Sequence, residues 1–205
     1  MKYYDVKQGS EEWHELRIGK ATASNFGCFM ANYGKDFGEP AKRYALQIAL
    51  ESLTGKKTEN GFTNEHMERG IAQEPIAMSL YEDMFFSEVK NGGFFCHVTY
   101  GDSPDGLISS DGALEIKSVI ASTHYATLKR GSYDPAYRWQ LMGHLDCTGR
   151  DWVDFASYCS DFPEDKQLLV YRIYRNDCVE DIEKLKERRS EFLELVQKTI
   201  TELKE

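Results

Sequence analysis

Residues 103–119 constrain the fold more than any other part of the chain, because they have the pattern of a single β-hairpin that carries charged groups. Two apolar runs flank a short polar segment that contains an Asp-Gly pair, and such a pair between apolar runs is a hairpin signal. Asp105 begins the first run, and Glu115 and Lys117 lie in the second. Because side chains alternate between the faces of a strand, Glu115 and Lys117 point to the same face.

The length of the turn decides whether Asp105 joins that face. A two-residue turn would put Asp105 on the opposite face from Glu115. A three-residue turn over 110–112, with Gly112 in the left-handed conformation, would pair Asp105 with Lys117 and place it on the shared face. We predict the three-residue turn, or an equivalent bulge near the start of the first strand.

Two carboxylates and an amine on one face suit a hard divalent cation beside a phosphodiester. Mg²⁺ and Mn²⁺ accept carboxylate oxygens, keep water ligands and bind phosphate oxygens. Lys117 could then orient or deprotonate a metal-bound water. The alternative is a solvated hairpin face. The apolar residues around the motif favour the metal site, because buried carboxylates are costly without a cation.

The composition predicts one globular domain over residues 1–205. Hydrophobic residues make up 41% of the chain, which is ample for a core, and no apolar run approaches the length of a membrane span. The first residues lack the apolar stretch of a secretory signal, so we expect a cytoplasmic protein. The net charge of −9 argues against a surface coated in nucleic acid, and any DNA contact must be local.

The five cysteines are scattered and form no C-x-x-C pair, so neither a disulfide framework nor a zinc site is indicated. We expect reduced, mostly buried thiols. Cys96-His97 and His144-x-x-Cys147 resemble metal-ligand pairs, but each lies in an apolar strand or helix pattern where a packed residue is the commoner case. We assign these residues no function.

The periodicity predicts a mixed sheet flanked by helices. Proline, glycine and capping signals set most helix ends, and a capping-box-like start at 177–180 opens the last helix. Pro75 should kink the fourth helix and aim Glu74 inward. The expected helices are 11–19, 22–32, 40–53, 63–86, 122–130, 135–147 and one from 177 toward the C-terminus. The expected strands are 94–100, 105–109, 113–119, 152–159 and 168–175.

Five motifs occur between about residue 8 and Phe155. They are Gln8-Gly9-Ser10-Glu11-Glu12-Trp13, Arg17-Ile18-Gly19 with Thr22-Ala23-Ser24, Gly70-Ile71-Ala72-Gln73-Glu74-Pro75, Ser103-Pro104-Asp105-Gly106 with Glu115-Ile116-Lys117, and Tyr137-x-x-Gln140-Leu141. In this order they resemble the family of phage lambda exonuclease and the YqaJ-type viral recombinases, within the PD-(D/E)xK nuclease superfamily. The resemblance implies an α/β fold with a restriction-endonuclease-like core, and it is strongest to prophage-encoded alkaline exonucleases.

The resemblance implies a metal site. In that family the motif aspartate and glutamate and the backbone carbonyl between Glu and Lys bind Mg²⁺, which points here to Asp105, Glu115 and the carbonyl of Ile116. The helix glutamate, Glu74, would help to hold the metal or its water. Lys117 would activate that water. From the residues alone, Glu74 could equally lie on a solvated helix face.

The resemblance also implies substrate-binding residues. Gln140 would contact the scissile region, with Tyr137 beside it, and Arg17, Ser24 and Ser103 would bind a terminal 5′-phosphate. A guanidinium can donate two parallel hydrogen bonds to phosphate oxygens, which is consistent with this role for Arg17. From the residues alone, Ser24 could be only a helix cap, Arg17 a surface ion-pair partner and Gln140 a hydrogen-bonding residue at the core edge.

The resemblance implies a metal-dependent enzyme that digests the 5′-terminated strand of linear double-stranded DNA in the 5′ to 3′ direction. It would leave 3′ single strands for phage-type recombination by annealing. The family forms ring-shaped trimers and works with a single-strand annealing protein, so both are expected partners. The alternatives are a structure-selective endonuclease with the same metal centre and a non-catalytic DNA-end-binding protein. Intact Asp105, Glu115 and Lys117 argue against the second alternative.

Overall fold

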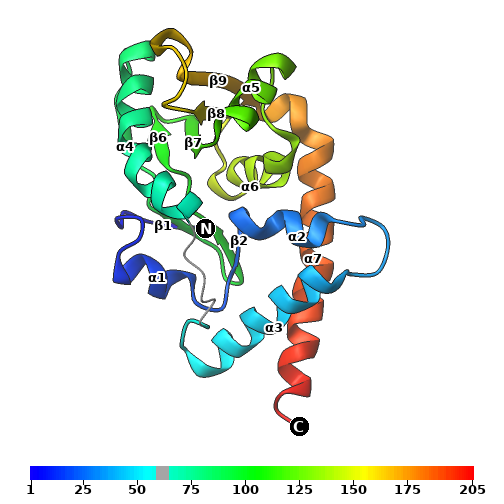
Figure 1. Ribbon diagram of the computed structural model, residues 1–205. Coiled ribbons are helices and arrows are strands. Elements are labelled where there is room, and N and C mark those ends of the chain that lie inside the picture. The colour runs from blue at the N-terminus through cyan, green and yellow to red at the C-terminus, as the bar shows by residue number, and fades with distance from the viewer. Residues whose placement is uncertain (59–64) are drawn as a thin grey trace.

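The computed structural model of the chain describes residues 1–58 and 65–205 (Figure 1). A five-stranded mixed sheet forms its core, in the order β3-β6-β7-β8-β9, with β7 and β8 parallel and all other neighbours antiparallel. Its strands are β3 (Val89–Asn91), β6 (Gly106–Ile108), β7 (Gly112–Ser118), β8 (Trp152–Tyr158) and β9 (Leu168–Tyr174). Helices flank this sheet (Figure 1), which confirms the predicted fold class.

A smaller four-stranded sheet, which was not predicted, lies beside the first. Its order is β1-β4-β5-β2, with strands β1 (Lys2–Tyr4), β4 (Phe94–Cys96), β5 (Tyr100–Asp102) and β2 (Ala21–Thr22). The single strand predicted over 94–100 is wrong, because the chain reverses there and the His97 amide donates to the Tyr100 carbonyl at 2.8 Å. Pairing of β2 with β5 brings the N-terminal motif next to the segment that leads into Ser103.

Seven α-helices are described. They are α1 (Glu11–Arg17), α2 (Phe26–Met30), α3 (Glu39–Thr54), α4 (Glu65–Phe85), α5 (Ala121–Arg130), α6 (Arg138–Thr148) and α7 (Val179–Glu202). Four 3-10 turns are also described, η1 (Ala23–Asn25), η2 (Pro135–Tyr137), η3 (Glu164–Lys166) and η4 (Arg175–Cys178). Within the described ranges no helix is both long and apolar enough to cross a membrane. All five cysteines are free thiols, as expected, but only Cys147 and Cys159 are buried, so the expectation of mostly buried thiols is wrong.

Several helix ends follow local sequence signals. Gly55 and Gly131 end α3 and α5 in the left-handed conformation, with φ of 65° and 69°, as predicted. The Asp134 side chain caps the turn before α6 by accepting from the amide two residues later. The predicted capping box at 177–180 is wrong, because η4 extends to Cys178, α7 begins at Val179, and the N-cap residue Cys178 makes no side-chain capping bond.

Two other predicted helices differ in extent. The helix expected over 22–32 is divided into η1 and the short α2. The helix expected over 63–86 begins partly outside the described residues, and α4 continues through Pro75 to Phe85. Pro75 therefore does not end this helix.

The two faces of the central sheet are covered by different helices (Figure 1). Phe155 and Leu141 pack on one face with α2, α3, α6 and α7 in the larger hydrophobic cluster. Tyr81 of α4 and Ile116 of β7 pack in a second cluster on the other face. Because Glu115 precedes Ile116 in the same strand, its side chain faces α6. The sheet thus directs Glu115 toward the helix that carries Gln140.

The β6–β7 hairpin has the predicted three-residue turn, displaced by one residue. Ile108 pairs with Gly112, so the turn is 109–111 rather than 110–112. Continuing the register places Asp105 opposite Glu115 instead of Lys117, and the Asp105 amide donates to the carbonyl of the residue before Glu115. Both ends of the turn lie one residue earlier than predicted, and the turn keeps an odd length, so the side chain of Asp105 stays on the same face as that of Glu115. The prediction that Asp105, Glu115 and Lys117 share a face is therefore confirmed.

The predicted left-handed Gly112 is wrong. The residue in that conformation is Ser109, with φ of 49°, and Gly112 is required for packing instead. A Cβ on Gly112 would lie 2.2 Å from the Trp152 ring of the neighbouring strand. Arg150 holds the turn by donating to the carbonyls of Ile108, Ser109 and Gly112 at 2.7–3.2 Å. Packing against β8 therefore set the position of the turn.

Candidate active site

Asp105, Glu115 and Lys117 meet at the end of the hairpin. Lys117 Nζ lies 2.5 Å from Glu115 Oε1 in an ion pair. Asp105 Oδ2 accepts the Ile116 amide at 2.6 Å, which fixes the Asp105 carboxylate across the strand from Glu115. The Glu115 side chain is 2% exposed. The hairpin therefore presents one buried carboxylate, one half-buried carboxylate and one ammonium together, as the sequence predicted.

Two residues at the start of α6 contact this group. Gln140 Nε2 donates to Glu115 Oε1 at 2.6 Å, so Gln140 belongs to the carboxylate cluster. The Tyr137 ring lies with its centroid 5.2 Å from Lys117 Nζ, within the range of a cation–π contact. Oε1 of Glu115 thus has two donors, one from its own strand and one from α6.

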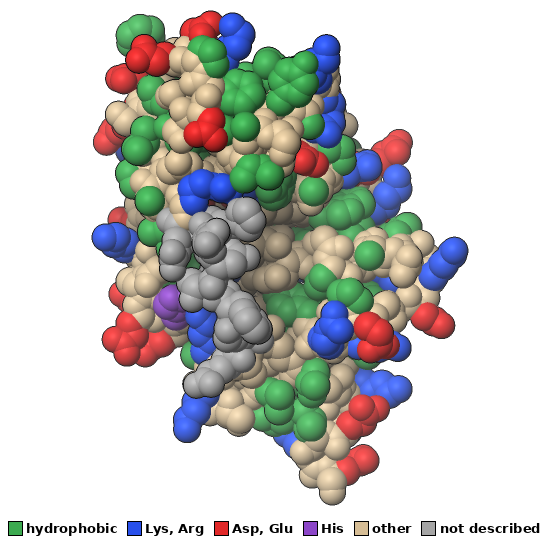
Figure 2. All heavy atoms as spheres, in the orientation of Figure 1, with side chains coloured by type: hydrophobic (Ala, Val, Ile, Leu, Met, Phe, Trp, Pro, Cys, Tyr) green, Lys and Arg blue, Asp and Glu red, His purple; other side chains and the backbone are tan. Residues whose placement is uncertain are grey.

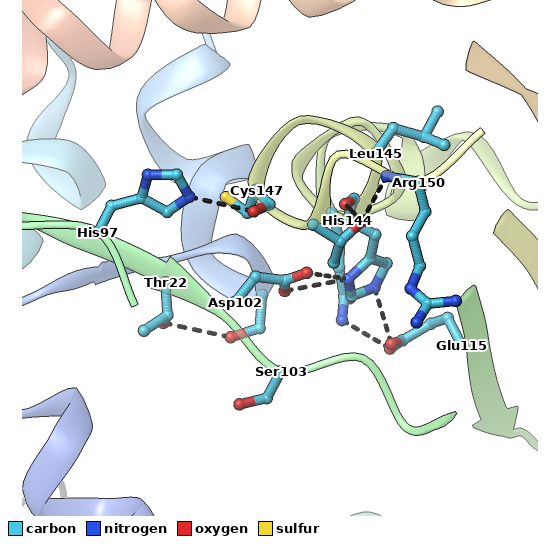
Figure 3. A network of polar contacts seen from close by, with 12 residues as sticks. Thr22, His97, Asp102, Ser103, Glu115, His144, Leu145, Cys147 and Arg150 are labelled. Atoms are coloured by element: carbon cyan, nitrogen blue, oxygen red, sulfur yellow. Dashed lines mark hydrogen bonds and ion pairs between the residues drawn. The ribbon is translucent and has the colours of Figure 1, made fainter. Parts of the chain in front are cut away.

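His144, to which the sequence gave no function, contacts the same carboxylate from the other side (Figure 3). Its Nδ1 lies 2.8 Å from Asp102 Oδ2 and its Nε2 lies 2.8 Å from Glu115 Oε2. The imidazole is fully buried. One sequence signal could have indicated this: His144 follows Gln140 by four residues, and residues four apart lie on the same helix face.

The charges of the cluster shift its pKa values in opposite directions. Burial, together with the charges of Glu115 and Glu74, raises the pKa of Asp105 well above its ordinary value. Burial alone would also raise the pKa of Glu115, but Lys117 and His144 lower it to about 2. Burial opposes protonation of His144, but Asp102 and Glu115 raise its pKa to about 10. Glu115 is therefore ionised, and the nearby negative charges of Glu115 and Glu74 disfavour ionisation of Asp105.

The predicted phosphate-binding residues form a second group on the N-terminal side. Ser103 Oγ accepts from Trp13 Nε1 at 2.8 Å and from Arg17 Nη1 at 3.2 Å. The Arg17 guanidinium also lies 4.0 Å from the Trp13 ring centroid, so Arg17 is held in place rather than being a free surface side chain. Ser24 is exposed, with its Oγ 3.5 Å from Thr22 Oγ1.

One cavity of about 180 Å³ joins the two groups. Its lining includes Arg17, Ser24, Ser103, Asp105, Glu115, Lys117 and Gln140. The structure thus brings together seven of the predicted site residues from α1, η1, the hairpin and α6. Glu74 is outside this lining. It lines an adjacent cavity of about 200 Å³ that also includes Asp105, and burial and the charge of Glu115 raise its pKa.

The residues present fit a hard divalent cation. Asp105, Glu115 and the Ile116 carbonyl offer oxygen donors of the kind that Mg²⁺ and Mn²⁺ prefer. Only Oδ2 of Asp105 has a hydrogen-bond partner in the described part of the chain, which leaves Oδ1 available. A cation there would relieve the repulsion that raises the Asp105 pKa. Among the residues whose side chains the structure describes, no three His, Cys, Asp or Glu side chains gather as a metal cluster.

Charge on the outer surface is mixed. In Figure 2, Lys and Arg side chains are interspersed with Asp and Glu over the face shown, without a continuous basic band. Positive charge in the cavity comes from Arg17 and Lys117. These two cations lie in the cavity although the chain has a net charge of −9.

Comparison with known protein families shows which family this chain belongs to. Residues 12–151 match the YqaJ-like viral recombinase domain. The chain belongs to this family. The matched range contains every residue of the candidate site, and it agrees with the resemblance drawn from the five motifs.

Solved structures extend the family relationship to almost the whole chain. An alkaline exonuclease (LHK-Exo) from Laribacter hongkongensis is 33% identical, with 95% of this chain and 96% of that chain covered and a TM-score of 0.84. Its complex with dAMP aligns over the same shares with a TM-score of 0.85. A phage-related exonuclease from Haemophilus somnus 129PT is 16% identical, covers 90% of this chain and 96% of that chain, and has a TM-score of 0.69. This last likeness shows the fold alone. A search of curated proteins gives no match.

Proposed function

We propose that this YqaJ-family protein is a metal-dependent exonuclease that hydrolyses the 5′-terminated strand of linear double-stranded DNA in the 5′ to 3′ direction. The observation that carries the proposal is the single cavity in which Arg17, Ser24 and Ser103 face the Asp105–Glu115–Lys117 group. A phosphate-binding side next to a phosphodiester-cleaving side suits removal of nucleotides from a 5′ end. The similar LHK-Exo is described as an alkaline exonuclease, which supports this reaction class.

The cation-binding residues would be Asp105, Glu115 and the Ile116 carbonyl, with Glu74 at the adjacent edge. When bound there, Mg²⁺ or Mn²⁺ would act as a Lewis acid on the phosphate and lower the pKa of a water ligand. Asp105 and Glu115 would fix its position, because each is anchored by a backbone or side-chain hydrogen bond.

Lys117 would act on the attacking water and on the reacting phosphate. Its ammonium is anchored 2.5 Å from Glu115 Oε1, and its charge offsets the negative charge that builds on the phosphorane. Proximity to the Tyr137 ring limits the positions of the ammonium on its flexible stem. Gln140 would hold Glu115 and reach the scissile region from α6.

Arg17 would supply end recognition. Its guanidinium donates two parallel hydrogen bonds to a phosphate more readily than a lysine could. Stacking on Trp13 and the bond to Ser103 preorganise it before any DNA arrives. The complex of the similar LHK-Exo contains dAMP, a mononucleotide of the kind released by stepwise cleavage, and this supports a phosphate-binding role for the cavity.

We further propose a ring-shaped homotrimer in the bacterial cytoplasm that hands 3′ single strands to a single-strand annealing protein. A ring with a basic inner channel and an acidic exterior would reconcile DNA binding with a net charge of −9. Sedimentation in the presence of DNA tests the trimer, and a monomer in that experiment would rule out the proposed ring.

The activity is tested on linear duplexes that carry either a 5′-phosphate or a 5′-hydroxyl, with Mg²⁺, Mn²⁺ or a chelator. We expect mononucleotide release from the 5′ strand, faster from the phosphorylated end and abolished by the chelator. A covalently closed circle is the control. Cutting of the circle would replace the exonuclease with the endonuclease alternative, and DNA binding without hydrolysis would indicate an end-binding protein.

A further inference from the structure

A buried chain of polar contacts runs behind the proposed metal site. Asp102 at the end of β5, His144 of α6 and Glu115 of β7 follow one another, with both ring nitrogens of His144 in contact with a carboxylate at 2.8 Å (Figure 3). The side chains of Asp102 and Glu115 are 2% exposed and that of His144 is 0% exposed. The contacts therefore exclude water and connect two sheets and a helix.

These contacts divide the two oxygens of Glu115 between different roles. Oε2 lies 2.8 Å from His144 Nε2 in an ion pair, and neither atom has a hydrogen-bond partner among the described residues. Oε1 faces Lys117 and Gln140, which line the cavity. A carboxylate held at Oε2 cannot rotate freely about its terminal bond, so Oε1 stays directed toward the cavity.

Asp102 in turn fixes the imidazole. His144 Nδ1 lies within 3.0 Å of both Asp102 oxygens, so the ring cannot turn away from Glu115 without losing this contact. Metal ligands commonly depend on such outer partners for their orientation. Asp102 also lines the cavity, but its side chain is 2% exposed and both of its oxygens contact His144.

A second buried histidine shows what a purely structural role involves. His124 is also fully buried, but its ring nitrogens contact Ser157 Oγ at 2.8 Å and the Lys166 carbonyl at 2.9 Å. Neither partner lines the candidate cavity. His124 thus has the burial of His144, and partners for both ring nitrogens, without a contact to the site.

We propose that His144 is a positioning residue that holds Glu115 for cation binding by linking Glu115 Oε2 to Asp102. This inference rests on the proposed function, since it assumes that Glu115 is a cation ligand. It adds two residues, His144 and Asp102, whose proposed role is to position Glu115.

The test compares two substitutions that each retain one half of the ring. In H144Q the side-chain amide nitrogen reaches the place of Nε2 and can still donate to Glu115. In H144N the amide nitrogen corresponds to Nδ1 and can donate only to Asp102. H124N is the matched control, because it removes half of a buried imidazole away from the site.

The primary measurement is Mn²⁺ binding to the DNA-free protein by electron paramagnetic resonance, with thermal unfolding recorded for every variant. We expect H144N to weaken Mn²⁺ binding about 10-fold or more, in the range for loss of an outer partner of a metal ligand. H144Q should stay within about 3-fold of the wild type, and H124N should lower thermal stability without changing Mn²⁺ affinity.

A second measurement separates positioning from general loss of structure. The Mn²⁺ concentration at half-maximal nuclease rate should rise in H144N, while the rate at saturating Mn²⁺ changes little. Equal Mn²⁺ affinities in H144N and H144Q, whether both normal or both reduced, would overturn the proposal. If H144N does not fold, D102N replaces it. D102N should also weaken Mn²⁺ binding, and a normal affinity in D102N would overturn the proposal in the same way.

The wild-type result separates this inference from the function beneath it. If the wild type binds Mn²⁺ and digests DNA while H144N matches it, only the role of His144 is lost. If the wild type neither binds Mn²⁺ nor digests DNA, the proposed function fails and the role of His144 fails with it.

Discussion

Replacement of Lys117 by methionine tests the proposed chemistry most directly. Methionine keeps an unbranched apolar stem next to Tyr137 and removes only the ammonium that lies 2.5 Å from Glu115 Oε1. A side chain that assists proton transfer contributes about 10²–10⁴-fold to the rate. We therefore expect turnover of linear duplex to fall by about 10²–10⁴-fold in K117M.

The same substitution has a calculable effect on stability. A hydrogen bond to a charged group contributes about 1.5–3 kcal/mol, and Glu115 keeps Gln140 and His144 as partners in K117M. We expect the metal-free variant to lose about 2 kcal/mol. For a chain of this size that corresponds to a decrease in Tm of about 4–8 °C, so the variant should remain folded at 25 °C.

Three assays of one preparation decide the matter: thermal unfolding, duplex binding by fluorescence anisotropy without metal, and single-turnover cleavage with Mg²⁺. DNA affinity should stay close to that of the wild type, because Arg17 and Ser103 on the phosphate-binding side are untouched. Near-normal turnover in a folded K117M would refute the assignment of Lys117. Loss of DNA binding in parallel with turnover would show that Lys117 binds substrate instead of acting on the reacting group.

Three further predictions concern residues around the same site. In R17K, cleavage of 5′-phosphorylated duplex should fall about 10-fold, as expected for a lost bidentate phosphate contact of about 1.4 kcal/mol or more, while cleavage of 5′-hydroxyl duplex is unchanged. Equal losses on both substrates would contradict a phosphate-specific role. G112A should lower the free energy of unfolding by about 1–3 kcal/mol in denaturant titration, because the new Cβ meets the Trp152 ring. Its counterpart S109G should stabilise by about 1 kcal/mol by removing a left-handed non-glycine residue, and a stable G112A would show that the Trp152 ring moves freely. E74Q should raise the Mg²⁺ concentration needed for half-maximal rate, because it removes a negative charge from the cavity next to Asp105. An unchanged metal requirement in E74Q would place Glu74 outside the site.

The hairpin illustrates how far a local pattern reaches. Alternation of side chains and an odd turn length were enough to place Asp105, Glu115 and Lys117 on one face. They did not give the position of the turn, because Gly112 accommodates the Trp152 ring and does not adopt a left-handed conformation. Turn propensities describe only neighbouring residues, so they cannot predict a contact between strands whose residues are 40 positions apart in sequence.

The helix ends divide in the same way. Gly55, Gly131 and Asp134 act through backbone groups within one turn of themselves, so their roles followed from sequence. The start of α7 did not follow from sequence, because η4 leads directly into this helix without the expected capping box. The second sheet was also missed, since its strands are two or three residues long and too short for a periodicity to appear.

The sequence by itself determined the α/β class and placed Asp105, Glu115 and Lys117 on one face, because these depend on short-range geometry. The residues of the proposed phosphate group came from the resemblance of the five motifs to the family. Only the tertiary structure joined Arg17 to the carboxylates in one cavity and placed His144 between Asp102 and Glu115. Those contacts connect elements from separate parts of the chain, and their distances are set by how β5, α6 and the central sheet pack.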